Sequence, residues 1–130
     1  MLYLAYGMNT NRAAMADRCP NAKWLGGFYL PGYRLVFRGV ADIVPDEGSV
    51  VPVVLWDITD ACLAALDRLE GYPNHYTRKI INGGWMAYMM VDKSREAAPG
   101  EHYYRMIEQG YRDAGLDDWH LIKAARDNAA

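Results

Sequence analysis

Apolar and polar positions follow two different periods along this chain, and the changes of period mark its elements. Runs that alternate, or that are continuously apolar and β-branched, predict strands at residues 2–6, 22–30, 33–38, 50–58, 76–81 and 85–91. Segments with apolar residues three or four positions apart, bounded by capping residues or glycine, predict helices at residues 12–17, 60–70, 101–114 and 119–126. Strands dominate roughly the first ninety residues and helices the remainder, which predicts an α+β fold rather than a regularly alternating parallel sheet.

Short segments rich in Gly and Pro predict the turns between these strands. Pro31-Gly32 and the segment 45–48 are expected to end the strands beside them. Asn82-Gly83-Gly84 is expected to join the last two strands as a hairpin. Short strands interrupted in this way suit a small curled sheet or a barrel.

The composition narrows the class of protein. The 130 residues predict a single domain over residues 1–130 with a core of its own, and 52% hydrophobic with 23% charged residues excludes a disordered chain. The net charge is -2 and there is no basic run, so neither nucleic acid nor an anionic membrane surface is expected as a partner. Ten tyrosines against two phenylalanines indicate hydroxyl groups on the partly buried walls of a pocket.

The spacing of cysteine and histidine predicts neither a metal site nor a cofactor. Cys19 and Cys62 lie far apart and form no CxxC motif, so both are interpreted as ordinary packing residues. The three histidines lack ligand spacing. No segment approaches the roughly 18 apolar residues of a membrane span, and the N-terminus lacks the pattern of a signal peptide. A soluble protein of a reducing, cytoplasmic compartment is therefore predicted.

Two places could carry chemistry. Gly7 follows a predicted strand and precedes a predicted helix, and backbone N–H groups in such a turn can converge on a carboxylate or an oxyanion. Glu70 is the last residue before the helix-ending Gly71, beside the apolar stripe of the helix. Partial burial and the helix C-terminus both raise the pKa of a carboxyl group, which makes it a better base. Taken separately, the two features are better explained by a tight turn and by an exposed Glu70 beside Arg68 or Arg78.

Together the two features resemble one family. The segment Tyr3-Leu4-Ala5-Tyr6-Gly7-Met8-Asn9, the helix end Leu66-Asp67-Arg68-Leu69-Glu70-Gly71-Tyr72-Pro73 and the following Tyr76-Thr77-Arg78 are similar to the gamma-glutamylcyclotransferase-like, or AIG2-like, family. The resemblance runs over nearly the whole chain. It implies a small mixed β-barrel flanked by helices, with a cavity at one end. It also implies an enzyme that cleaves a gamma-glutamyl amide by cyclisation and releases 5-oxoproline without a cofactor.

The resemblance also assigns roles to residues. It implies that Glu70 is the general base and acid, and that Tyr6, Gly7, Met8 and Asn9 form the loop that holds the glutamyl head. Tyr88 and Tyr103 are implied as pocket walls. Met8 stands where the family has a serine. Little changes if backbone amides bind the ligand, whereas the pocket is narrower and the substrate class is open if the serine hydroxyl makes the contact. Asp67, one helical turn before Glu70, is expected at the surface, where it could position Arg78.

Two other readings stay open at this point. A non-catalytic module could bind a small metabolite or a nucleotide in the same cavity, and an interaction protein could keep only a vestigial pocket. A gamma-glutamyl small molecule is the expected partner if the chain is an enzyme. An amino acid, a peptide, a lysine ε-amine or an aminoglycoside-type amine would each serve as the leaving group. Both a monomer and a homodimer are compatible with the sequence.

Overall fold

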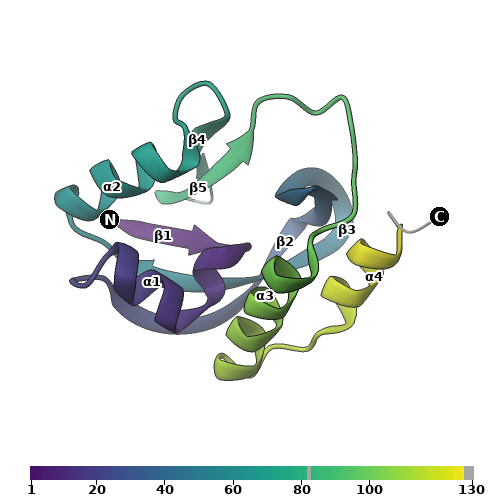
Figure 1. The fold of residues 1–130 in the computed structure, drawn as a ribbon, viewed down its shortest axis with the longest axis horizontal. Coiled ribbons are helices and arrows are strands. Elements are labelled where there is room, and N and C mark those ends of the chain that lie inside the picture. The colour runs from purple at the N-terminus through teal and green to yellow at the C-terminus, as the bar shows by residue number, and fades with distance from the viewer. Residues whose placement is uncertain (82, 128–130) are drawn as a thin grey trace.

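A computed structural model describes residues 1–81 and 83–127 (Figure 1). The strands are β1 (Leu2–Ala5), β2 (Lys23–Arg38), β3 (Val40–Asp57), β4 (Tyr76–Ile81) and β5 (Trp85–Met90). The helices are the short 3-10 helix η1 (Met8–Thr10) and the α-helices α1 (Arg12–Arg18), α2 (Asp60–Glu70), α3 (Glu101–Asp113) and α4 (Trp119–Asp127). In this part of the chain no helix is long and apolar enough to cross a membrane.

The strands form one mixed sheet in the order β2-β3-β1-β5-β4. The short β1 lies in its centre, where Tyr3 pairs with Trp56 of the antiparallel β3 and with Met86 of the parallel β5. The α+β class with a mixed sheet flanked by helices is therefore confirmed. The closed barrel is not: over the described residues β2 and β4 remain edges, and Figure 1 shows an open sheet in which the β2–β3 hairpin curls past α3 and α4.

Two predicted turns were wrong because the β2–β3 hairpin runs through them. Pro31 still pairs with Val50, and a register shift before Tyr33 absorbs Gly32 as a bulge with a φ of 85°. The segment 45–48 likewise lies within β3, and the hairpin turns at Gly39, whose φ is 80°. The hairpin of β4 and β5 is confirmed by the pairing of Ile81 with Trp85. Asn82 of its predicted turn lies outside the described residues.

The core has two parts, one on each side of the central strand. One part joins the curled hairpin to α3 and α4 through residues such as Phe37, Ile107 and Leu121. The other joins the sheet to α1 and α2 through Met15 and Leu66. The end of β1 and the residues that follow it lie between these two parts, so packing from both sides fixes the loop that leads into η1.

Cys19 and Cys62, which the sequence presents as ordinary packing residues, form a disulfide, so that interpretation is corrected. Their Cα atoms lie 5.2 Å apart, a usual separation for such a bond. Cys19 caps the C-terminus of α1 and Cys62 lies in the first turn of α2. The expectation of a reducing compartment rested partly on the interpretation of these cysteines as unpaired. The disulfide removes that support.

A buried cluster of charges fixes the connection between β5 and α3. The Asp42 side chain is fully buried and pairs with Arg38 Nε at 2.9 Å and with Lys93 Nζ at 2.7 Å. Its other oxygen accepts the Met90 N–H at 3.0 Å. Arg38 Nη1 in turn donates to the carbonyl oxygens of Lys93 and Arg95, both at 3.0 Å. The cluster therefore holds residues 93–95 against the hairpin and sets where α3 begins.

Candidate active site

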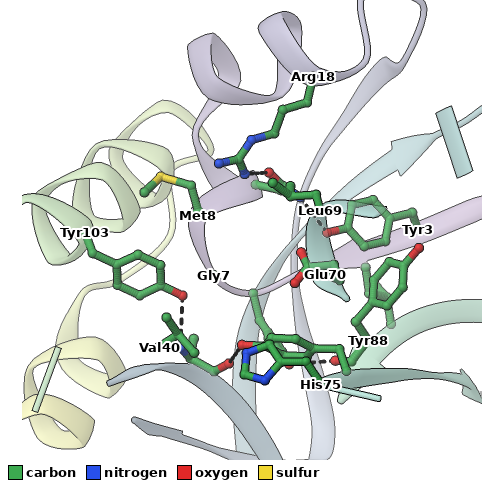
Figure 2. A pocket seen from close by; sticks show the side chains of 15 residues that line it. Tyr3, Gly7, Met8, Arg18, Val40, Leu69, Glu70, His75, Tyr88 and Tyr103 are labelled. Carbon is green, nitrogen blue, oxygen red and sulfur yellow. Dashed lines mark hydrogen bonds between the residues drawn. The ribbon is translucent and has the colours of Figure 1, made fainter. Parts of the chain in front are cut away.

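A pocket of about 250 Å³ opens where the ends of β1, α2 and β5 meet the first turn of α3 (Figure 2). The structure brings together in it every residue that the sequence analysis proposed for the site. These are Glu70, Tyr6, Gly7, Met8, Asn9, Tyr88 and Tyr103. They come from segments up to 97 positions apart (Tyr6 to Tyr103), so their convergence is a result of the fold and not of chain proximity.

Glu70 is the last residue of α2, and local sequence determines this position. The helix begins with Thr59, whose hydroxyl accepts the Cys62 N–H at 3.2 Å. It ends because Gly71 adopts a left-handed conformation with a φ of 65°, where an added Cβ would lie 3.0 Å from the Cβ of His75. Figure 2 shows the Glu70 carboxylate directed into the pocket.

The pKa of the Glu70 carboxyl group lies near neutrality. Burial raises its pKa from 4.5 to about 7, and the nearby positive charge of Arg18 partly opposes this rise. At neutral pH the group is therefore divided between its two protonation states. A proton carrier works best when its pKa lies close to the working pH.

The loop at residues 7–9 requires glycine at its first position. A Cβ on Gly7 would lie 2.9 Å from Tyr103 Oη and 3.3 Å from the Cβ of Ala41. The Gly7 carbonyl accepts the Thr10 N–H at 3.0 Å, which closes the first turn of η1. Figure 2 shows the Met8 side chain directed toward α3, away from Glu70. Met8, which stands where the resemblance implied a serine, therefore lines the pocket on the side of α3.

Asn9 is fixed by three neighbours. Its Oδ1 accepts a hydrogen bond from Arg18 Nη1. Its Nδ2 donates to Tyr3 Oη at 3.0 Å, and its carbonyl oxygen accepts the Trp56 Nε1–H at 2.9 Å. Asn9 is buried, so these bonds hold the loop rigidly and occupy its amide.

Tyrosines make up much of the pocket wall, and the hydroxyl groups of several of them donate hydrogen bonds to oxygen atoms of the protein. Tyr6 Oη donates to the Tyr88 carbonyl and Tyr76 Oη to the Ala41 carbonyl, each at 2.6 Å. Tyr88 Oη donates to Asp67 Oδ1, also at 2.6 Å. Burial raises the pKa of all three phenols. These rings therefore shape the pocket, and their protons hold its framework together.

Asp67 lies outside the pocket lining and supports the pocket wall through Tyr88. Besides the bond from Tyr88, its Oδ1 lies 3.4 Å from Arg78 Nε. The guanidinium of Arg78 lies 4.2 Å above the ring of Tyr72. Asp67 thus pairs with Arg78, the alternative that the sequence analysis left open, and it supports the Tyr88 wall.

Sequence reasoning missed Tyr3, Arg18, His75 and Tyr76 as pocket residues. Tyr3 and Tyr76 belong to the family-like segments, and both lie in predicted strands to which the sequence analysis gave no role in the site. Arg18 carries no motif, and its place depends on how α1 packs beside the loop. No local spacing pattern indicates that Arg18 lies in the site. Tyr3, in contrast, lies close to Tyr6 and Gly7 in the sequence, and this proximity is a signal that could have been used.

The chain matches the family model described as "Gamma-glutamyl cyclotransferase, AIG2-like" over residues 3–110. The chain belongs to this family. The match contains both the loop after β1 and Glu70, the two features that meet in the pocket of this AIG2-like protein.

Solved structures share the fold of this AIG2-like chain. A protein described as gamma-glutamyl cyclotransferase is 23% identical with a TM-score of 0.78, and the match covers 95% of this chain and 85% of that one. An uncharacterized protein from Homo sapiens, loc79017, is 24% identical with a TM-score of 0.79 and the same coverage. YkqA from Bacillus subtilis is 23% identical with a TM-score of 0.81; all of this chain matches 54% of YkqA. No curated protein matches the chain.

Proposed function

We propose that this protein cleaves a gamma-glutamyl amide by intramolecular cyclisation, releasing 5-oxoproline and an amine. The observation that carries the proposal is the position of Glu70, a partly buried carboxyl group with a pKa of about 7 that faces the Gly7–Asn9 loop in one pocket. Family membership supports the same reaction class. Cyclisation also suits a small pocket, because the nucleophile and the electrophile belong to one substrate.

Glu70 carries protons between two nitrogen atoms in this mechanism. The α-nitrogen of the glutamyl unit gives up protons through Glu70 and attacks the γ-carbon of the same unit. The bond from this carbon to the departing nitrogen then breaks, and that nitrogen receives the protons from Glu70. The lactam nitrogen keeps one hydrogen and the amine leaves as an ammonium ion, so the protons balance. No metal or redox step is needed for this chemistry.

Positioning supplies much of the rate in such a reaction. A folded glutamyl chain held for ring closure avoids an entropic cost of about 7 kcal/mol or more. In the proposed complex, the Tyr6 and Tyr88 rings confine the chain. The amides of the Gly7–Asn9 loop bind either the α-carboxylate or the oxygen that becomes negatively charged.

The test is release of 5-oxoproline, followed by mass spectrometry. The panel contains gamma-glutamyl-alanine, ε-(gamma-glutamyl)-lysine and a gamma-glutamyl alkylamine, with α-glutamyl-alanine as the isomer that cannot form the same lactam. We expect lactam from at least one gamma-glutamyl compound. We also expect a rate that falls about tenfold per pH unit below pH 7, as Glu70 becomes protonated.

Glu70→Gln is expected to lower the rate at least about 100-fold, because the amide cannot carry a proton. Glu47→Gln is the matched control, since Glu47 is exposed on β3 away from the pocket. Full activity of Glu70→Gln would refute the mechanism. Compounds that bind but are recovered unchanged would instead establish the non-catalytic binding module.

A further inference from the structure

Three side chains form a one-way chain of hydrogen bonds that ends in the pocket. Arg18 Nη1 donates to Asn9 Oδ1, and Asn9 Nδ2 donates to Tyr3 Oη at 3.0 Å. Arg18 has only protons to give, so its bond fixes the orientation of the Asn9 amide. The Asn9 amide in turn donates to a lone pair of the Tyr3 hydroxyl oxygen. The hydroxyl proton of Tyr3 therefore remains available to another acceptor. Figure 2 shows Arg18 above the loop and the Tyr3 hydroxyl beside Glu70.

The free proton distinguishes Tyr3 from most other tyrosines of the wall. Tyr6, Tyr76 and Tyr88 each donate to an oxygen of the protein. Within the described part of the chain, only the hydroxyls of Tyr3 and Tyr103 line this pocket while bonded solely as acceptors. These two phenols therefore have a donor to offer to a ligand.

The surroundings of Tyr3 keep its hydroxyl protonated, so the hydroxyl stays available as a donor. Its side chain is 4% exposed, and its ring contacts that of Tyr88 edge to face with centroids 6.0 Å apart. Burial and, after it, the charge of Glu70 raise the pKa of the phenol, so it stays protonated at neutral pH. Hydrogen bonds in a chain polarise one another, and this chain starts at a cation. The Arg18 charge thus strengthens the donor at the far end.

On the basis of the proposed function, we propose that Tyr3 is a second catalytic residue, which donates its O–H to the γ-carbonyl oxygen of the substrate as that oxygen becomes an alkoxide. Arg18 and Asn9 are its positioning residues. Both nitrogens that Glu70 serves are bonded to the γ-carbon in the tetrahedral intermediate. The oxygen on that carbon therefore lies next to Glu70, which is where the Tyr3 hydroxyl lies.

Tyr103 is less suited to this role. Its oxygen accepts the Ala41 N–H at 2.9 Å and lies against Gly7, on the side of the pocket formed by α3. No cation begins its hydrogen-bond chain.

The experiment measures kcat and KM for the gamma-glutamyl compound that the wild-type protein cleaves best. Tyr3→Phe is expected to lower kcat and kcat/KM by the same factor, about 100-fold, because the lost bond forms mainly in the transition state. Tyr111→Phe is the matched control: the buried Tyr111 hydroxyl has no hydrogen-bond partner among the described residues and lies outside the pocket, so its loss leaves kcat unchanged. Thermal unfolding of each variant verifies the fold.

Arg18→Met tests the chain without changing Tyr3, and it serves alone if Tyr3→Phe fails to fold. It is expected to lower kcat about tenfold and to move the acidic limb of the pH profile upward, since Arg18 lowers the pKa of Glu70. On the plateau above the acidic limb, where Glu70 is ionised in both, the double variant should be no slower than Tyr3→Phe, because both changes break one chain. The outcome that refutes the proposed function differs from the outcomes that refute only the role of Tyr3.

A wild-type protein that releases no lactam refutes the proposed function and, with it, the role of Tyr3. A wild-type protein that releases lactam, with a Glu70-dependent rate that Tyr3→Phe leaves unchanged, upholds the function and overturns the role of Tyr3. If Tyr3→Phe raises KM and leaves kcat unchanged, the role of Tyr3 is also overturned, since the hydrogen bond from Tyr3 would then act on the ground state.

Discussion

Glu70→Gln is expected to stabilise the fold at alkaline pH while it removes activity. Wild-type Glu70 is a carboxyl group whose pKa is 4.5 when exposed and about 7 in the fold, because burial disfavours its charged form. The folded protein therefore binds this proton more tightly than the unfolded chain does. The contribution of Glu70 to stability is most favourable below pH 4.5 and is lost as the pH rises through 7.

The size of this loss follows from the two pKa values. The interval between 4.5 and about 7, at about 1.4 kcal/mol per pH unit, corresponds to about 3 kcal/mol at full ionisation. Glutamine has the same shape and never ionises, so its cost does not change with pH. The free energy of unfolding of Glu70→Gln minus that of the wild type should thus increase by about 2 to 3 kcal/mol between pH 5 and pH 9.

Urea unfolding at the two pH values measures this difference directly. At pH 9 the variant should also melt roughly 10 °C above the wild type, given the enthalpy of a domain of this size. Glu47→Gln, which removes an exposed carboxylate outside the pocket, is measured beside it as the control. If Glu70→Gln and the wild type differ by the same amount at pH 5 and pH 9, Glu70 is not held as an acid of raised pKa, and the argument for its role fails.

Two further predictions concern the framework of the pocket. The double variant Cys19→Ala/Cys62→Ala should lose about 4 kcal/mol in urea unfolding, because the disulfide closes a loop with a sequence separation of 43. Dithiothreitol should destabilise the wild type equally and leave the double variant unchanged; an indifferent wild type would contradict this. Asp42→Ala should cost about 3–5 kcal/mol, since it leaves the buried Arg38 charge unpaired; a loss below about 1 kcal/mol would show that the cluster does not hold the fold.

Local sequence patterns were enough to predict the helices and strands whose ends are marked by a clear local signal, such as a glycine. The end of α2 at Glu70 follows from Gly71, and the β4–β5 pair follows from its alternation. The glycine loop after β1 was also predicted, because an apolar strand stops there. These local features supplied the two halves of the site, and the order of motifs along the chain indicated that they meet.

The missed features all depend on distant parts of the chain. Pro31-Gly32 signals a turn locally, but the partner strand continues past it and the pairing energy of a long hairpin prevails. The disulfide between Cys19 and Cys62 cannot be inferred from a separation of 43 residues. The direction of the Tyr3 hydroxyl depends on Asn9 and Arg18, so a composition rich in tyrosine cannot show which proton remains free.

The bond from Trp56 to the loop gives this protein an optical reporter. The indole of Trp56 is 4% exposed and donates to the Asn9 carbonyl at 2.9 Å, so its emission senses the field at the pocket loop. Trp119, in contrast, is 55% exposed and emits from a wet environment. In a variant whose Trp24, Trp85 and Trp119 are replaced by phenylalanine, a change in the Trp56 emission would therefore signal ligand at the loop, before any product is formed.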